Sequence, residues 1–294
     1  MSQEPNQSDR ITTSERPPNP DAVGNTHTGA PTEITPEQIH AYALATQDLN
    51  PLYAPGPDQI ASPLFVVRPL VDELFAAIHD PALHADVLRL VHGEQELHFL
   101  RPLQPGDVVT ASAVIDQVTP KSSGHLVRIA QELRCADEVV TRSLSTMFIR
   151  SKSPAAPKPK TSPGDQASPP EVLYSEVEPT TEDQSHRYAA ISNDRNPIHL
   201  DPEVARKAGL PDVILQGLCT LAMATKAVVN GPCGGDSRRL ASIRARFARP
   251  VLNADVLTTR VHQGPEPWVY GFETRNQRDH VVLSHALATL RSQG

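Results

Sequence analysis

Several features that mark particular protein classes are absent from this chain of 294 residues. The N-terminal region lacks the apolar core of a signal peptide, and no run of about 18 apolar residues occurs anywhere in the chain. The net charge of −7 gives no basic surface for nucleic acid. These absences predict a soluble cytoplasmic protein that binds neither nucleic acid nor a membrane.

Cysteine is also scarce, and its placement argues against a metal site. Cys135, Cys219 and Cys233 do not have the spacing of metal-ligand pairs. Cys219 lies in an apolar helical pattern and Cys135 in a strand pattern, so we interpret both as reduced, buried thiols. We therefore expect no bound metal.

The hydrophobic content of 38% is low and the 29 prolines are many, but both deviations are local. Residues 1–33 contain no aromatic residue, so they cannot bury enough apolar surface to offset chain entropy. Residues 151–170 contain six prolines and read as an extended linker. We predict a disordered segment over 1–33, a folded domain over 34–150, a linker over 151–171 and a second folded domain over 172–294.

The two folded parts repeat one another. Residues 35–53 and 181–199 align without a gap at an offset of 146, and eight of their 19 positions are identical. Residues 99–108 match 247–256 at an offset of 148. We call 34–150 copy one and 172–294 copy two, and we predict a pseudo-twofold pair that resembles a fused homodimer.

Each copy shows helices first and strands afterwards. Thr35 with Gln38, and Thr181 with Gln184, have the pattern of a capping box at a helix start. Helices are predicted over 36–46, 64–79, 182–192, 202–208 and 217–229. Strands are predicted over 93–101, 107–118, 124–135 and 138–150, and over 239–248, 254–263, 267–275 and 280–292. Strands that follow one another without alternating helices indicate an α+β fold, with an antiparallel sheet wrapped around helix 217–229.

The stretch from Ser192 to His199 holds the main candidate site. Asp194 and His199 place a carboxylate and an imidazole five residues apart, in a loop stiffened by Asn196-Pro197. Gly217 follows at the start of the apolar helix. An acid/base pair with backbone donors at a helix N-terminus is suited to a carbonyl compound whose oxygen gains negative charge during reaction.

This pattern resembles the hydratase motif of the MaoC-like dehydratases, a family that includes the (R)-specific enoyl-CoA hydratases. The resemblance rests on residues 192–202 with 208–211 and 214–220. It implies two tandem hotdog domains, each a sheet wrapped around a central helix, and a hydro-lyase that interconverts 2-enoyl and (R)-3-hydroxyacyl thioesters without a cofactor. Two positions depart from the family: Asn193 replaces the usual Gly before the Asp, and Gln216 replaces the usual His before Gly217.

The resemblance assigns roles to individual residues. Asp194 and His199 transfer protons, the Gly217 amide binds the developing oxyanion, and Asn196 holds the loop. Arg244 and Arg246 are candidates for binding the phosphates of the substrate, although a solvated strand face explains them as well.

Copy one serves as an internal control for these assignments. It keeps Asp48, Asn50 and Pro51 but has Tyr53 at the position of His199, and its residues 61–65 contain no glycine. We therefore predict one active site per chain, in copy two, with copy one forming the other wall of an acyl tunnel.

Other functions remain open from the sequence. A hotdog thioesterase needs no such motif, and a non-catalytic acyl-binding subunit would explain the two departures. The substrate is expected to be a CoA or an acyl-carrier-protein thioester, so a carrier protein is a candidate partner. The fused pair either stands alone or forms a further homodimer.

Overall fold

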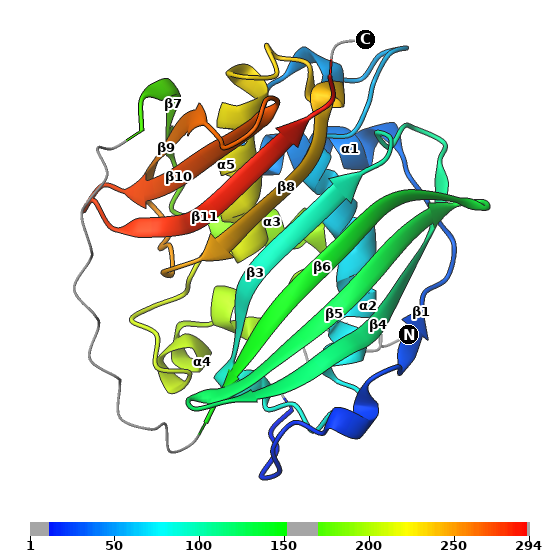
Figure 1. Cartoon of the computed structure of the whole chain (residues 1–294), viewed down its shortest axis with the longest axis vertical. Helices are drawn as coiled ribbons and strands as arrows, with labels where there is room; N and C mark the ends of the chain where they lie inside the picture. Colours follow the sequence, from blue (N-terminus) through cyan, green and yellow to red (C-terminus); the bar gives the residue numbers. More distant parts are fainter. Residues whose placement is uncertain (1–11, 152–169, 293–294) are drawn as a thin grey trace.

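One continuous antiparallel sheet forms the body of the molecule, with the helices gathered on one of its faces (Figure 1). The computed structural model describes residues 12–151 and 170–292. Most of the predicted linker, 152–169, therefore lies outside the described residues. The strand order is β1-β4-β5-β6-β3-β8-β11-β10-β9-β7, and β2 also pairs with β4.

The elements follow the predicted order in each copy. The strands of copy one and its N-terminal extension are β1 (Thr26–Thr28), β2 (Thr32–Glu33), β3 (Leu90–Phe99), β4 (Val108–Lys121), β5 (Gly124–Cys135) and β6 (Glu138–Arg150). The strands of copy two are β7 (Val172–Pro179), β8 (Leu240–Phe247), β9 (Val256–Gln263), β10 (Val269–Asn276) and β11 (Val281–Leu290). The α-helices are α1 (Pro36–Ala45), α2 (Val67–Ile78), α3 (Gln184–Ser192), α4 (Pro202–Lys207) and α5 (Gly217–Asn230).

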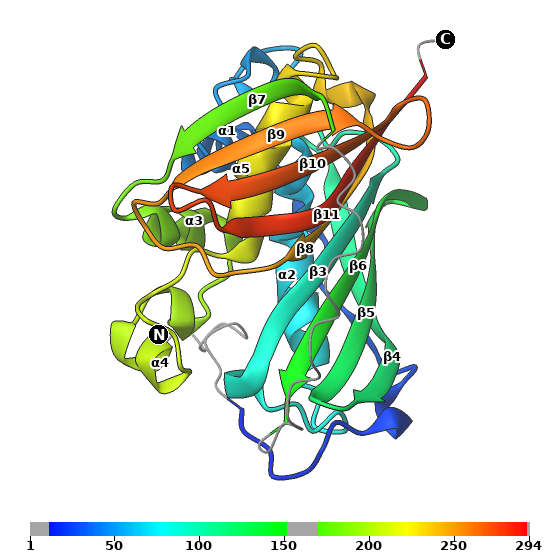
Figure 2. The ribbon, with the colours of Figure 1, turned by 60° about the vertical axis from the view of Figure 1, so that its left-hand side comes forward.

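The two copies meet along β3 and β8 and are related by a pseudo-twofold axis (Figure 2). Glu96 of β3 pairs with Arg244 of β8, and these two residues are equivalent at the repeat offset of 148. On the helix side, the hydroxyls of Tyr42 and Tyr188 lie 3.1 Å apart and are equivalent at the offset of 146. Equivalent residues meet only on a twofold axis, so the predicted pseudo-dimer is confirmed.

Helix α5 is the central helix of copy two. It is buried on almost every side, which is expected of a helix enclosed by a sheet and by neighbouring helices. Its side chains belong to a hydrophobic cluster that also contains α1 and β3 residues of copy one, so the two copies share a core. The predicted arrangement, a sheet wrapped around helix 217–229, is confirmed.

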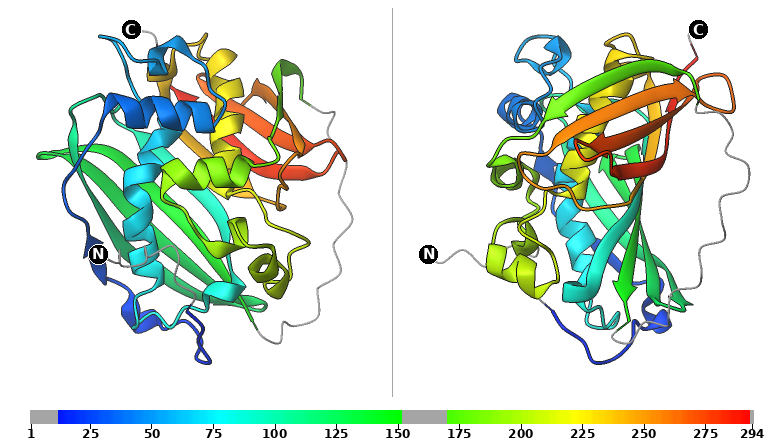
Figure 3. Two further views of the ribbon diagram at one scale, coloured as in Figure 1. Left: turned by 180° about the vertical axis from the view of Figure 1, so that it is seen from behind. Right: turned by 90° about the vertical axis from the view of Figure 1, so that its left-hand side faces the viewer.

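Helices α1 and α3 lie next to each other and cross over α2 and α5, on the side of these helices that faces away from the sheet (Figure 3). The capping box at the start of α1 is present: Gln38 N–H donates to Thr35 Oγ1 at 3.3 Å, and Thr35 N–H donates to Gln38 Oε1 at 3.2 Å. In α3 the corresponding Thr181 N–H donates to Gln184 Oε1 at 3.3 Å, but the helix itself begins at Gln184.

The prediction of disorder over residues 1–33 is wrong for residues 12–33. These residues contain a short 3₁₀ turn at Pro20–Ala22 and the strands β1 and β2, which pair with β4. Ala22 is buried, and His27 forms an ion pair with Asp80 at 3.1 Å. The segment contributes little apolar surface of its own, but it gains order because the edge of β4 supplies backbone hydrogen-bond partners.

The strand β7 was not predicted either, because it follows the proline-rich stretch and has exposed side chains along much of its length. Strand β7 pairs with β9 at the far edge of the sheet. Within the described part of the chain, no helix is long and apolar enough to cross a membrane.

Candidate active site

The loop after α3 begins with a left-handed residue. Asn193 has φ 65° and ψ −1° and ends the helix, so the chain turns sharply before Asp194. Copy one turns in the same way at Gln47, with φ 56°. Asparagine tolerates this conformation better than most non-glycine residues, so the backbone turn is kept without the family's glycine.

The loop is held by two side-chain oxygens that accept hydrogen bonds from backbone amides two residues further on. Asn196 N–H donates to Asp194 Oδ1 at 3.2 Å, and Ile198 N–H donates to Asn196 Oδ1 at 3.3 Å. Asn196 thereby caps the 3₁₀ turn Pro197–His199. This geometry places the Asp194 carboxylate and the His199 ring on the same side of the loop.

Asp194 and His199 face each other across a short gap. Nε2 of His199 lies 3.9 Å from Oδ2 of Asp194, and the two side chains are 9% and 14% exposed. The other ring nitrogen, Nδ1, is 2.8 Å from the carbonyl oxygen of Ile214. A carbonyl only accepts, so Nδ1 carries the hydrogen and the Nε2 lone pair of the neutral ring faces Asp194.

Gly217 occupies the first position of α5. At this helix end Thr220 N–H donates to the carbonyl oxygen of the N-cap residue Gln216 at 3.1 Å, so the amides of residues 217–219 have no acceptor within the helix. A β-carbon on Gly217 would lie 3.1 Å from the ring of Phe247. A larger residue here would push against the Phe247 ring, so glycine suits this packing, and it leaves space at a helix end where the dipole favours negative charge.

Gln216 has a structural role that the sequence did not indicate. Its side chain is fully buried, and Nε2 donates to the carbonyl oxygens of Ser185 at 3.1 Å and of Asp194 at 3.3 Å. It thereby ties the loop that carries Asp194 to the first turn of α3. Its own Oε1 has no hydrogen-bond partner within the described ranges, 12–151 and 170–292. The replacement of the family's histidine thus gives an amide that fixes the backbone of Asp194.

Arg244 and Arg246 are not brought together with the other predicted site residues. Both are exposed, whereas their neighbours Ile243 and Ala245 are buried on the helix side of β8. Because side chains alternate along a strand, the two arginines lie on the opposite face of the sheet from Gly217. There they pair across the seam with Glu96 and Glu94, respectively. The solvated strand face is the interpretation that fits their position.

The corresponding region of copy one shows what is missing there. Leu215 N–H donates to Val251 O at 2.8 Å, and Ala61 N–H donates to Leu103 O at the same distance. Val251 and Leu103 are equivalent at the repeat offset of 148, so Gly217 corresponds to Pro63. Proline has no N–H and cannot act as an oxyanion donor.

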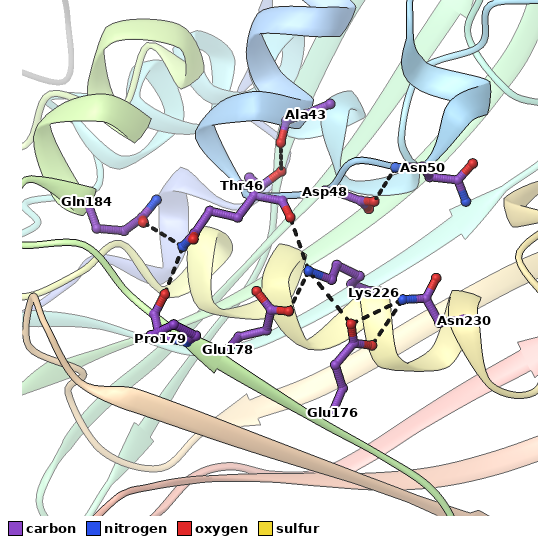
Figure 4. Close-up of polar contacts among 11 residues, drawn as sticks. Ala43, Thr46, Asp48, Asn50, Glu176, Glu178, Pro179, Gln184, Lys226 and Asn230 are labelled. Atoms are coloured by element: carbon purple, nitrogen blue, oxygen red, sulfur yellow. Dashed lines mark hydrogen bonds and ion pairs between the residues drawn. The ribbon is translucent and has the colours of Figure 1, made fainter.

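The carboxylate of copy one, on Asp48, is buried and is not presented to a substrate. Burial is the main cause that raises the pKa of Asp48 to about 6, and Asn50 N–H donates to Oδ1 at 3.2 Å. Figure 4 shows Lys226 of α5 reaching toward this loop between Glu176 and Glu178.

The contacts around Lys226 join the two copies. Its Nζ donates to the carbonyl oxygen of Gln47 at 3.1 Å and forms ion pairs with both glutamates of β7. Tyr53, at the position of His199, is fully buried. The loop of copy one is therefore part of the interface between the copies. In the part of the chain described here, no group of three or more His, Cys, Asp or Glu side chains is arranged to hold a metal ion.

Comparisons with known proteins agree with this geometry. Residues 166–276 match the family described as MaoC like domain, and residues 21–143 match the FAS1-like dehydratase domain region. The chain is 28% identical over 237 residues to probable enoyl-CoA hydratase 2 of Dictyostelium discoideum, covering 77% of this chain and 78% of that protein. It is 27% identical over 291 residues to peroxisomal multifunctional enzyme type 2 of Mus musculus, covering 92% of this chain but only 38% of that protein.

Solved structures show the same architecture. A MaoC-like dehydratase from Phytophthora Capsici superposes with a TM-score of 0.80 at 23% identity, covering 94% of this chain and 98% of the other. A Mycobacterium tuberculosis protein described as a double hotdog gives a TM-score of 0.65 at 14% identity, covering 91% and 95%. At these identities the likeness establishes the fold alone.

The fold is a double hotdog, and the matched domains and relatives place the protein in the class of hydro-lyases that act on acyl thioesters. The chain belongs to the MaoC-like dehydratase family.

Proposed function

We propose that the chain adds water to 2-enoyl thioesters, and removes it from (R)-3-hydroxyacyl thioesters, at a single site in copy two. The observation that carries the proposal is the pair of Asp194 and His199, 3.9 Å apart and next to the N-terminus of α5. The gap is too long for a direct hydrogen bond, but one water or one substrate hydroxyl placed there touches both groups.

The proton transfers follow from the tautomer of His199. With Nδ1–H donated to Ile214 O, the Nε2 lone pair can take a proton from the bound water while the Asp194 carboxylate orients that water. In hydration the proton held on Nε2 then passes to the α-carbon as the enolate collapses to the 3-hydroxyacyl thioester. In dehydration the same pair takes the α-proton and gives a proton to the departing hydroxyl, which leaves as water. Residues in this role typically contribute about 10²–10⁴-fold in rate.

The thioester oxygen becomes enolate-like when water adds at the β-carbon. The first-turn amides of α5, beginning with Gly217 N–H, are suited to bind it, because they have no acceptor within the helix and the helix dipole adds a partial positive charge. A single donor of this kind is worth about 3–4 kcal/mol in the transition state. Gln216 supports the arrangement by holding the Asp194 backbone close to the same helix end.

Several finer assignments belong to the proposal. Copy one is the non-catalytic half, since Tyr53 and Pro63 stand where copy two has His199 and Gly217. The carrier of the acyl group is CoA or an acyl carrier protein, and no cofactor takes part. A cytoplasmic location and a further homodimer stay predictions.

The direct test is hydration of crotonyl-CoA and longer 2-enoyl-CoAs, followed as loss of the enoyl absorbance. We expect the wild type to hydrate at least part of this panel and Asp194→Asn to be inactive across it. Equal hydration rates for the wild type and Asp194→Asn would show that the proposed site is wrong. A parallel assay for released CoA thiol separates hydration from the thioesterase alternative, which produces free thiol and no 3-hydroxyacyl thioester. Tight acyl-CoA binding without turnover would favour the non-catalytic alternative.

A further inference from the structure

One histidine of copy one lies next to the active site of copy two. His92 is on β3, and its ring packs edge-to-face against Phe247 with the ring centroids 4.9 Å apart. Phe247 is the residue whose ring lies 3.1 Å from the β-carbon position of Gly217. A continuous line of contacts therefore runs from the helix end at Gly217 through Phe247 to His92.

The side chain of His92 points to the helix side of the sheet. His92 pairs with Met147 of β6, which is buried on that side, and directly paired residues of antiparallel strands share a face. The pairing is interrupted between His92 and Glu94, so Gly93 forms a bulge. Bulges re-aim the neighbouring side chain, and they are frequent next to active sites.

The bulge lies in a strand whose length differs between the two copies. Strand β3 has 10 residues and β8 has 8, although both follow a short turn that ends in arginine, at Arg89 and Arg239, and both end in phenylalanine. Copy one is therefore two residues longer at the place where its strand passes the site of copy two. His92 lies in this longer stretch.

Gln95, which lies close to His92 on β3, belongs to a buried network of hydrogen-bonded side chains. Gln95, Ser145, Ser143 and Gln131 form a buried chain of hydrogen bonds across β3, β6 and β5, with donor–acceptor distances of 2.9, 3.0 and 3.3 Å. The chain ends where Gln131 Nε2 donates to the carbonyl oxygen of Leu70 in α2, at 2.7 Å.

The Nε2 atom of His92, by contrast, has almost no solvent-exposed surface and no hydrogen-bond partner among the residues that the structure describes. Burial lowers the pKa of His92 to about 4, with the Glu94 backbone and the Gln95 side chain acting in the opposite direction, so the ring is neutral near pH 7. A buried polar atom without a partner is unfavourable, and such atoms in native proteins call for a ligand or another explanation.

We propose that His92 is a specificity-determining residue of the site in copy two, and that its Nε2 bonds to a hydroxyl group on the acyl chain of the thioester, beyond the double bond. The inference rests on the proposed function, because it takes the thioester carbonyl to lie at Gly217. In this proposal the acyl chain runs from that carbonyl past Phe247 to His92, along the line of contacts described above. A hydroxyl both donates and accepts, so it satisfies either tautomer of the neutral ring, whereas a saturated chain leaves Nε2 without a partner.

The test compares unsubstituted 2-enoyl-CoAs with enoyl-CoAs of the same length that carry a hydroxyl at successive positions beyond the double bond. We expect the wild type to have a kcat/KM about tenfold or more higher for at least one hydroxylated substrate, because a site built around a hydrogen bond rejects the analogue that lacks it. The ratio between the two substrates is the readout for every variant, so a general loss of activity does not affect it.

Two variants and one control complete the design. His92→Leu is expected to abolish the preference, and His92→Gln to retain part of it. His98→Leu makes the same substitution on β3 at an exposed residue, and it is expected to keep the full preference. An equal kcat/KM for both substrate series in the wild type, or a preference that survives His92→Leu, would overturn the inference. If the wild type hydrates no enoyl-CoA at all, including crotonyl-CoA, the proposed function itself fails.

Discussion

The two copies place the same Asp-x-Asn-Pro sequence in the same turn and use it differently. In copy two, Asp194 faces an imidazole and the open end of α5. In copy one, Asp48 is buried beside Tyr53, and the helix after it begins with a proline. The comparison shows that the loop adopts the same conformation whether or not a histidine and a helix-end amide lie next to the aspartate. The Asn caps and the left-handed turn persist where the acid/base pair and the oxyanion donor are both absent.

The largest effect is expected from the two residues that we propose transfer protons. His199→Ala should lower kcat for enoyl-CoA hydration by about 10²–10⁴-fold, since the group that takes the water proton is lost. Asp194→Asn should have an effect of similar size, although asparagine retains the oxygen that accepts from Asn196 N–H. The matched control is Asp48→Asn in copy one, which should hydrate at the wild-type rate. Loss of activity in that control would show that both loops take part in catalysis.

The oxyanion donor is tested by making copy two resemble copy one at a single position. Gly217→Pro removes the N–H, and proline is accepted at the first position of a helix. Gly217→Ala keeps the N–H but places a methyl group 3.1 Å from the Phe247 ring, as proline also does. We expect kcat of the Pro variant to lie about 10²-fold or more below that of the Ala variant. Similar kcat values would mean that packing against Phe247, and not the amide, explains the glycine.

The buried carboxylate of copy one predicts a pH-dependent stability effect. The pKa of Asp48 is raised by burial to about 6, above the value of about 3.9 expected in the unfolded chain. Between these values the folded state holds a proton that the unfolded state has lost, so the contribution of Asp48 to stability falls as pH rises through this window.

Asp48→Asn should therefore raise the free energy of unfolding by about 3 kcal/mol at pH 7.5, where the penalty is fully present. The gain should shrink as the pH is lowered toward about 4.5. Urea denaturation of the wild type and the variant across this range measures it. A gain that is the same at both ends of the range would exclude the titration of Asp48 as its cause.

A smaller effect is expected at Gln216, where copy one offers a matched control. Gln216→Leu removes the hydrogen bonds to the carbonyls of Ser185 and Asp194, so the catalytic loop is less well positioned. We expect kcat to fall about tenfold with little change in KM. Gln59 is a buried glutamine of copy one whose Nε2 donates to the carbonyls of Pro36 and Tyr53, at 3.1 and 3.0 Å. Gln59→Leu should lower the melting temperature but leave kcat unchanged. If both variants lower kcat equally, the effect of Gln216 is structural.

The smallest effect is expected at the arginines of β8. Arg244→Gln and Arg246→Gln alter the exposed face of the sheet, opposite Gly217, and break only exposed cross-strand pairs. The KM for crotonyl-CoA should change by less than about twofold, since exposed pairs contribute little. A KM that rises about tenfold in these variants would instead support phosphate binding by Arg244 and Arg246.

The parts of the fold that were predictable depend on local signals. The strands from β3 to β6 were expected within three residues of their observed ends, because alternating side chains and turn residues mark them in the sequence. The order of residues 12–33 was not predictable, since it comes from pairing with β4 and not from the segment's own apolar content. The role of Gln216 was missed for a similar reason: its two acceptors are backbone carbonyls, and the sequence does not show where these lie.

The sequence by itself determined the repeat, the family and the candidates Asp194, His199 and Gly217, because these depend on residue identity and spacing along one short loop and one helix start. The tertiary structure decided which distant groups meet them. It placed Pro63 at the position equivalent to Gly217, turned Arg244 and Arg246 to the opposite face of β8, and brought His92 of copy one against Phe247 of copy two. These relations depend on strand register and on the pseudo-twofold axis, and both arise only when the complete chain packs.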